Sequence, residues 1–181
     1  MKSKLRKYYI SLREKKYFEV ANEFADRFLK KITITKKNII GSYWPINSEL
    51  NVQKLNTVLN EKGFRVSLPS IQNNKKMVFK TLQNHASLKL HSFGMPEPDP
   101  NSSLVIPDIF LVPLVAFDKF GNRLGYGAGF YDRYFSTLSK HKKVFKIGVG
   151  FSFQMCKKIP NTKRDLKLDA ICTETKLYNI S

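Results

Sequence analysis

The sequence predicts an α/β protein in which helices cover both faces of a mostly parallel sheet. Short apolar runs alternate with segments that carry apolar residues at helical spacing, a pattern typical of parallel sheets. Apolar residues make up 42% and charged residues 25% of the 181-residue chain, which is ordinary for a globular protein. No internal repeat or linker is evident, so residues 1–181 are expected to form a single domain.

The first part of the chain is expected to contain two helices and three strands. Apolar residues at helical spacing, with Lys, Arg and Glu between them, predict a helix over residues 1–30. The apolar run NIIGSYWP predicts a buried strand. Residues 48–63 are expected to form a helix, with Ser48 as N-cap and Gly63 at its end. FRVSLP, which ends at Pro69, and KKMVFKTL predict the next two strands.

The rest of the chain is expected to contain a proline-rich crossing, three strands and two helices. Four prolines between Pro96 and Pro107 argue against regular structure there, and this region could cover a site. DIFLVPLVAF is the most apolar predicted strand; a glycine-rich loop and a helix over about residues 129–139 follow it. VFKIGVGF predicts a strand, SFQMCKKI a short helix and LDAICTE a last strand. Ligands bind at the carboxyl ends of strands in such sheets, so the glycine-rich loop is the expected location of a site.

The segment GNRLGYGAGFYDRYF, residues 121–135, holds four of the chain's nine glycines. It matches neither the dinucleotide-binding fingerprint nor a P-loop. Successive glycine N–H groups can nevertheless bind phosphate oxygens, and the N-terminus of the following helix adds to that attraction. Arg123 offers a guanidinium fork for phosphate, and Asp132 offers a hard oxygen ligand for Mg²⁺. The alternative is a flexible turn in which Asp132 only stabilises the first turn of a helix.

The formal net charge of the chain is +18, from 32 basic and 14 acidic residues. This charge could reflect nucleic-acid binding, enrichment of lysine by a low-GC genome, or attraction of a polyanionic substrate. The basic residues are spread along the chain without an RNA-binding motif, so no specific nucleic-acid partner is expected. No apolar run approaches the length of a membrane span and no signal-peptide pattern is present, so a cytoplasmic protein without a membrane partner is expected.

One long segment, DIFLVPLVAFDKFGNRLGYGAGFYDRYF, resembles the signature of the 5-formyltetrahydrofolate cyclo-ligase family. SYWPINSEL, LPSIQNNKKMVF, GMPEP and RDLKLDAICTE resemble further family segments in the same order, so the resemblance covers essentially the whole chain. It implies an enzyme that uses ATP and Mg²⁺ to convert 5-formyltetrahydrofolate into 5,10-methenyltetrahydrofolate, with release of ADP and phosphate. It also implies a three-layer α/β sandwich with a sugar-phosphate isomerase-like, or Rossmann-like, topology.

The resemblance also implies site residues. Those expected to contact ATP are Lys2, Lys4, Arg6, Arg123, Leu124, Gly125, Tyr126, Gly127, Ala128, Gly129, Phe130 and Tyr131. Those expected to contact the folate are Trp44, Glu49, Tyr126, Gly127, Ala128, Gly129 and Phe130. Asp132 and Asp165 are the expected Mg²⁺ ligands, and Arg123 and Asp132 the expected catalytic residues.

Taken without the family, several of these residues have simpler interpretations. The N-terminal cations could form a solvated helix face, and Asp165 could be an ordinary loop carboxylate. Trp44 could be a core residue at a strand end, and Glu49 an acid in the first turn of a helix. Phe130 stands where the family usually has Tyr, so any contact of that hydroxyl is lost.

The expected partners are small molecules, a reduced folate and ATP, and the protein is expected to be a monomer. Cellular folates carry polyglutamate tails, which the positive charge could attract. A nucleic-acid-binding protein, or a different small-molecule kinase or isomerase on the same fold, is the rival interpretation.

Overall fold

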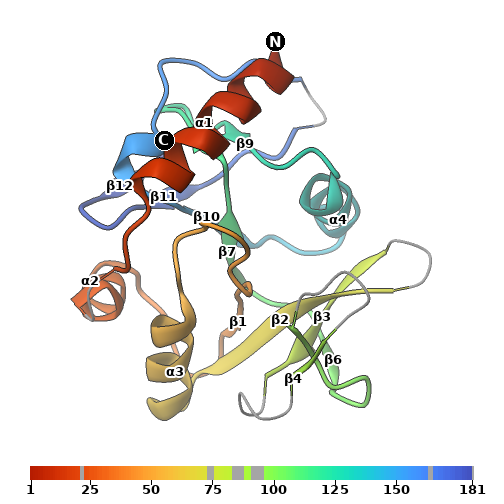
Figure 1. Cartoon of the computed structure of the whole chain (residues 1–181). Coiled ribbons are helices and arrows are strands. Elements are labelled where there is room, and N and C mark those ends of the chain that lie inside the picture. Colours follow the sequence, from red (N-terminus) through yellow and green to blue (C-terminus); the bar gives the residue numbers. More distant parts are fainter. Residues whose placement is uncertain (21–22, 73–75, 83–87, 91–95, 163–164, 181) are drawn as a thin grey trace.

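The computed structural model describes residues 1–20, 23–72, 76–82, 88–90, 96–162 and 165–180 (Figure 1). The elements in chain order are α1 (Lys2–Lys16), α2 (Glu23–Lys31), β1 (Ile39–Gly41), α3 (Gln53–Glu61), β2 (Arg65–Ile71), β3 (Met77–Thr81), β4 (Leu88–Leu90), β5 (Pro96–Pro98), β6 (Leu104–Val105), β7 (Ile109–Pro113), β8 (Ala116–Phe117), β9 (Arg123–Leu124), α4 (Phe130–Leu138), β10 (Phe145–Val149), the 3₁₀ turn η2 (Ser152–Gln154), β11 (Ala170–Cys172) and β12 (Leu177–Asn179).

The main sheet has eight strands in the order β12-β11-β10-β7-β1-β2-β3-β6. The five inner strands, from β11 to β2, are parallel, whereas β12 pairs antiparallel at one edge and β3 and β6 at the other. The predicted mostly parallel sheet is therefore confirmed. Counted in chain order, the parallel strands lie 2-1-3-4-5, a doubly wound order whose switch point falls between β1 and β7.

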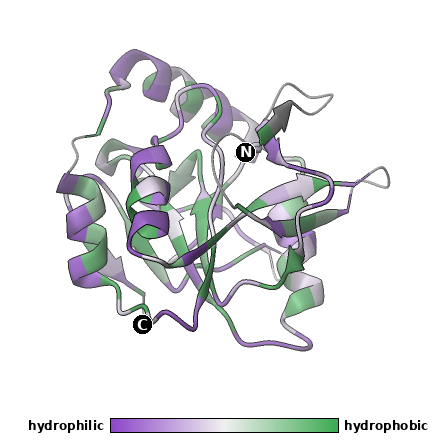
Figure 2. Cartoon of the chain, turned by 90° about the horizontal axis from the view of Figure 1, so that it is seen from below, coloured by the Kyte–Doolittle hydropathy of each residue, from purple (hydrophilic) through white to green (hydrophobic). Residues whose placement is uncertain are grey.

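Helices lie against both faces of this sheet. In β7, Ile109 and Leu111 pack in one core cluster with Phe28 of α2 and Leu55 of α3. Phe110 and Val112, which point to the opposite side of the same strand, pack in a second cluster with Phe135 and Leu138 of α4. Because successive strand side chains point to opposite faces, α2 and α3 cover one face and α4 the other (Figure 1). Figure 2 shows the hydrophobic strands in the interior and hydrophilic residues along the outer sides of the helices.

The predicted helix over residues 1–30 is wrong, because two helices occupy this region. Tyr17 ends α1 in an extended conformation, with φ −59° and ψ 138°. The rings of Tyr17 and Phe18 then pack against Phe151, with ring centroids 6.0 and 5.0 Å away. The chain therefore leaves the helix where these two partly exposed rings contact Phe151. This break lets α1 lie over the carboxyl end of the sheet, where Tyr9 packs with Val115, Leu124 and Ile159.

The helix predicted from Ser48 instead begins at Gln53. The Ser48 hydroxyl accepts a hydrogen bond from Arg13 at 3.1 Å and does not cap the helix. Leu50 is buried, and its carbonyl accepts a hydrogen bond from the Tyr43 hydroxyl at 2.7 Å. These tertiary contacts hold the segment before α3 in a turn. The predicted end is confirmed, since Gly63 follows α3 with a φ of 75°.

The expectation that the prolines exclude regular structure from residues 96–107 is wrong in part. β5 pairs antiparallel with β4 although it begins and ends with proline. N–H groups two residues apart point to the same side of a strand, so both prolines can face away from the paired edge. β2 likewise continues through Pro69 to Ile71, because β1 no longer pairs with it there.

The remaining elements largely follow the predictions. DIFLVPLVAF is not one strand, because it contains β7 of the main sheet and then β8, which pairs with β9 in a separate two-stranded sheet. The predicted helix after the glycine loop is α4. VFKIGVGF and LDAICTE contain β10 and β11, whereas the predicted helix in SFQMCKKI is only the single turn η2. None of the helices in the described ranges has the length and apolar character needed to cross a bilayer.

Candidate functional site

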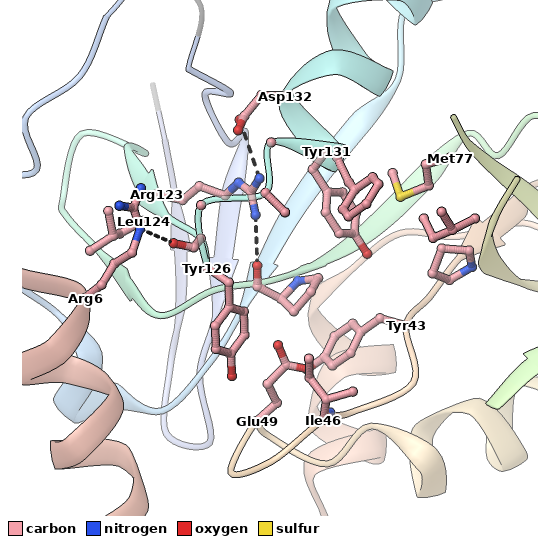
Figure 3. Close-up of a pocket in the computed structure, with 18 of the residues that line it drawn as sticks. Arg6, Tyr43, Ile46, Glu49, Met77, Arg123, Leu124, Tyr126, Tyr131 and Asp132 are labelled. Atoms are coloured by element: carbon pink, nitrogen blue, oxygen red, sulfur yellow. Dashed lines mark hydrogen bonds and ion pairs between the residues drawn. The ribbon is translucent and has the colours of Figure 1, made fainter. Parts of the chain in front are cut away.

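A cavity of about 270 Å³ opens at the carboxyl ends of β1, β2 and β7, beside the switch point of the sheet (Figure 3). Most residues with a predicted role line this one cavity: Lys2, Arg6, Trp44, Glu49, Arg123, Leu124, Gly125, Tyr126, Gly127, Ala128, Gly129, Phe130, Tyr131, Asp132 and Asp165. Lys4 is exposed and is not part of the lining. The fold thus brings together residues from α1, β9, three loops and α4.

The glycine loop, residues 125–129, turns its carbonyls toward arginine side chains. Arg6 donates to the Gly125 carbonyl and Arg133 to the Ala128 carbonyl, both at 2.8 Å. Gly127 and Gly129 have φ values of 107° and 70°, which L side chains rarely adopt. Within the part of the chain that the structure describes, no acceptor receives the N–H groups of residues 125–129. These donors and the N-terminus of α4 together are suited to an anion.

Arg123 places a cation beneath this loop. Its side chain is only 7% exposed and lies with its guanidinium 3.5 Å from an Asp132 oxygen. The guanidinium also donates to the Pro113 carbonyl at 3.0 Å and stacks on the Tyr131 ring at 5.1 Å. Burial lowers the pKa of Arg123, and Asp132 opposes that shift. Its buried Nε finds no partner among the described residues, so the cation keeps a donor for a ligand.

The two aspartates lie on different elements that border the cavity. Asp132, in the first turn of α4, accepts the Leu166 N–H at 3.0 Å. Asp165 pairs with Lys2 at 2.6 Å and accepts the Thr162 N–H. Burial alone would raise the pKa of Asp165, but its bonds from Lys2 and Thr162 hold the pKa below its ordinary value.

This donor set fits Mg²⁺ held together with a nucleotide. No group of three or more His, Cys, Asp or Glu side chains in the described ranges could hold a metal by itself. Mg²⁺ is, however, commonly bound by one or two carboxylates plus phosphate oxygens and water. Asp132 and Asp165 border the cavity as two hard oxygen donors, beside a loop suited to phosphate.

Glu49 supplies a buried carboxylate at the other side of the cavity. The Tyr131 hydroxyl and the Glu49 carboxylate are directed into the same space (Figure 3). Burial raises the pKa of Glu49 from 4.5 to about 7, against the lowering effects of the Ile46 N–H, Arg13 and Arg123. The Ile46 N–H donates to one carboxylate oxygen at 3.0 Å. Glu49 is therefore an acceptor for ligand N–H groups that titrates near neutral pH.

Sequence reasoning missed several residues of the lining: Tyr43, Ile46, Pro69, Ile71, Met77, Glu97 and Pro113. Glu97 is buried and accepts the Ser70 hydroxyl at 2.7 Å and the Ile71 N–H at 3.1 Å. Its position in GMPEP, one of the segments that resembles the family, could have identified it. Most of the others are apolar strand residues, which carry no signal that separates a cavity wall from the core.

The chain is similar to known proteins over most of its length. Residues 1–174 match the model of the 5-formyltetrahydrofolate cyclo-ligase family. The 5-formyltetrahydrofolate cyclo-ligase of Escherichia coli is 28% identical over 166 residues, which cover 88% of this chain and 91% of that protein. The Haemophilus influenzae protein of the same name is 33% identical over 135 residues, or 71% of this chain and 72% of that protein.

A solved structure shares both fold and sequence with the chain. The NMR structure of 5,10-methenyltetrahydrofolate synthetase from Aquifex aeolicus superposes with a TM-score of 0.80 at 30% identity, over 99% of this chain and 92% of that one. The family match spans nearly the entire sequence and includes every residue that borders the cavity. The chain belongs to the 5-formyltetrahydrofolate cyclo-ligase family.

Proposed function

We propose that the protein converts 5-formyltetrahydrofolate into 5,10-methenyltetrahydrofolate, with ATP as co-substrate and Mg²⁺ as cofactor. The observation that carries this proposal is the cavity in which free loop N–H groups, Arg123 and two aspartates face a buried carboxylate. The names of the relatives support the choice of substrate. We further propose that residues 1–181 act as one domain with a sugar-phosphate isomerase-like topology.

The nucleotide would bind on the side of the glycine loop. The N–H groups of residues 125–129 would donate to phosphate oxygens, and Arg123, Lys2 and Arg6 would balance their charge. Asp132 and Asp165 would hold Mg²⁺, which when bound neutralises charge on the transferred phosphoryl oxygens. Lys4 lies outside the cavity and would act only through its charge.

The folate would bind on the side of Glu49. A pterin ring presents N–H donors that a carboxylate accepts, and its flat faces suit aromatic or apolar walls. Trp44, Phe130 and the missed residues Tyr43 and Met77 supply such walls. The Tyr131 hydroxyl is buried without a partner in the described chain, so it could bind a polar atom of the substrate.

The chemistry requires the formyl oxygen to become a leaving group. The oxygen would attack the γ-phosphorus, so that an O–P bond forms and the bond to ADP breaks. N10 would then attack the activated carbon and lose its proton to the departing phosphate or to water, and the C–O bond would break to release phosphate. The protein contributes position and charge, because little covalent work falls to side chains in phosphoryl transfer. Arg123 would stabilise the charge that develops on the transferred group.

A direct assay tests this proposal. Protein, 5-formyltetrahydrofolate, ATP and Mg²⁺ are mixed, and the near-ultraviolet absorbance of the methenyl product is followed. Product is expected only when all four components are present, and chelation of Mg²⁺ with EDTA should stop its formation. ATP consumption with a different acceptor, without a methenyl product, would instead favour another kinase on this fold.

Gly127→Ala is expected to weaken Mg·ATP binding by about tenfold or more. Alanine is strained at a φ of 107°, and its Cβ would lie 3.3 Å from the Arg6 guanidinium carbon. The loop would have to change its backbone and turn its N–H groups away from phosphate. Titration calorimetry measures the Kd. Gly63→Ala is the matched control, since its φ is also positive, at 75°, but it lies after α3 and not in the cavity. If Gly127→Ala binds Mg·ATP as tightly as Gly63→Ala does, the glycine loop is not the phosphate site.

A further inference from the structure

A buried arginine on α1 connects the two sides of the cavity. Arg13 is only 1% exposed, although it lies near the end of a mostly polar helix. Its Nε donates to the Ser48 hydroxyl at 3.1 Å, and one terminal nitrogen donates to the Leu114 carbonyl at 3.2 Å. The other terminal nitrogen donates to the Tyr126 hydroxyl, and the guanidinium carbon lies 5.4 Å from the centroid of that ring. One side chain thus joins α1 to three separate loops.

A structural ion pair does not account for this residue. Arg13 forms no salt bridge with a carboxylate in the part of the chain described. Its hydrogen-bond acceptors in the described ranges are neutral oxygens, so no carboxylate in direct contact offsets the cost of removing this charge from water. An apolar side chain could fill this volume at lower cost. A role in the site would explain why a cation is placed there.

The contacts of Arg13 lie on both sides of the cavity. Tyr126 belongs to the glycine loop, whereas Ser48 directly precedes Glu49 in the chain. Arg13 favours the ionised form of Glu49, as Arg123 also does. The hydroxyls of Tyr43 and Tyr131 also interact electrostatically with this carboxylate, whose charge raises the pKa of both.

α1 also carries two of the cations of the site. Lys2 pairs with Asp165, and Arg6 holds the Gly125 carbonyl. Both lie on the same helix as Arg13. Because the contacts of Arg13 help to fix the position of α1, they also help to fix the positions of Lys2 and Arg6 in the site.

We propose that Arg13 is a positioning residue that holds Tyr126 of the glycine loop and Glu49 in one arrangement, and so couples the nucleotide side of the cavity to the folate side. The inference rests on the proposed function, because the roles of the two sides come from it. A cation is required since a neutral side chain could neither donate in three directions nor favour the ionised Glu49.

A double-mutant cycle tests the coupling. Arg13→Lys keeps the charge but loses the fork of directed donors, and Tyr126→Phe removes only the hydroxyl acceptor. Each single variant is expected to weaken Mg·ATP binding and lower kcat/KM for the folate by about tenfold. Because both changes break the same contact, the double variant should be little worse than the poorer single one. Arg65→Lys, at an exposed position on β2, is the matched control and should behave as the wild type.

The pH dependence of kcat/KM distinguishes a positioning role of Arg13 from a purely structural role. Ionised Glu49 accepts the N–H groups of the folate, so kcat/KM should rise with pH through the pKa of this group. Arg13→Met removes a cation that lowers this pKa, so the rising limb should move to higher pH. If this variant fails to fold, Arg13→Lys and Tyr126→Phe still complete the cycle.

The outcomes distinguish this inference from the proposed function. A wild-type protein that binds Mg·ATP without turning over the folate would refute the proposed reaction, and the cycle could still be completed with Kd values for Mg·ATP. Single effects that multiply in the double variant would overturn the coupling. If the Arg13 variants lower only Tm, and leave the Kd for Mg·ATP, kcat/KM for the folate and the pH profile unchanged, Arg13 has a structural role only.

Discussion

Asp132→Asn is expected to lower kcat at least about 100-fold while the fold remains intact. Asparagine has the same shape and can still accept the Leu166 N–H that Asp132 accepts at 3.0 Å. It loses the negative charge that would hold Mg²⁺ and that lies beside Arg123. Turnover of 5-formyltetrahydrofolate at increasing Mg²⁺ measures the effect, and half-saturation should move to much higher Mg²⁺.

Asp26→Asn is the control for this experiment. Asp26 is exposed in the first turn of α2 and does not border the cavity, so its loss changes the net charge by the same amount. Wild-type kinetics are expected for this variant. If Asp132→Asn also retains wild-type turnover and Mg²⁺ dependence, Asp132 has no place in a metal site.

Much of the fold could be predicted because its signals are local. The apolar run of β7 and the alternation of strands and helices identify a parallel sheet without any knowledge of contacts. The glycine cluster likewise marks a loop at a strand end, which is where the cavity lies. Two of the failures concern tertiary contacts. Tyr17 and Phe18 end α1 because Phe151 lies within reach, and Ser48 does not cap α3 because Arg13 binds its hydroxyl.

The site was predicted less completely than the fold, for a related reason. Residues of the glycine loop stand out by type, whereas Tyr43 and Met77 look like any apolar residue of a strand. Arg13 resembles its many basic neighbours on α1, and only the docking of that helix over the sheet shows that it is buried. A sequence records that a charge is present but not whether water reaches it, and burial is what gives Arg13 and Glu49 their significance.

Glu49→Gln is expected to stabilise the free protein above pH 7. Burial raises the pKa of Glu49 from 4.5 to about 7, so the folded protein binds this proton more tightly than the unfolded chain. Stability from this group is therefore complete below about pH 4.5 and is lost as pH rises toward 7. The loss amounts to at most about 3 kcal/mol. Glutamine is neutral at every pH and can still accept the Ile46 N–H, so the variant should avoid this loss.

Urea unfolding at pH 4.5 and pH 8 measures the difference. The free energies of unfolding of Glu49→Gln and wild type should agree at the lower pH, and the variant should be more stable at the higher pH. Glu61→Gln, at the exposed end of α3, should differ little from wild type at either pH. If the free energies of unfolding of Glu49→Gln and wild type differ by the same amount at both pH values, Glu49 is not a buried carboxyl with a pKa near 7.

The same substitution should raise KM for the folate by about tenfold, because the amide presents an N–H₂ group where the pterin N–H donors need an acceptor. The two effects have one origin. Burial makes the ionised carboxylate costly in the free protein and also makes it a strong acceptor for the donors of a ligand. A variant that gains stability above pH 7 and loses folate affinity would show that Glu49 is retained for binding at the expense of stability.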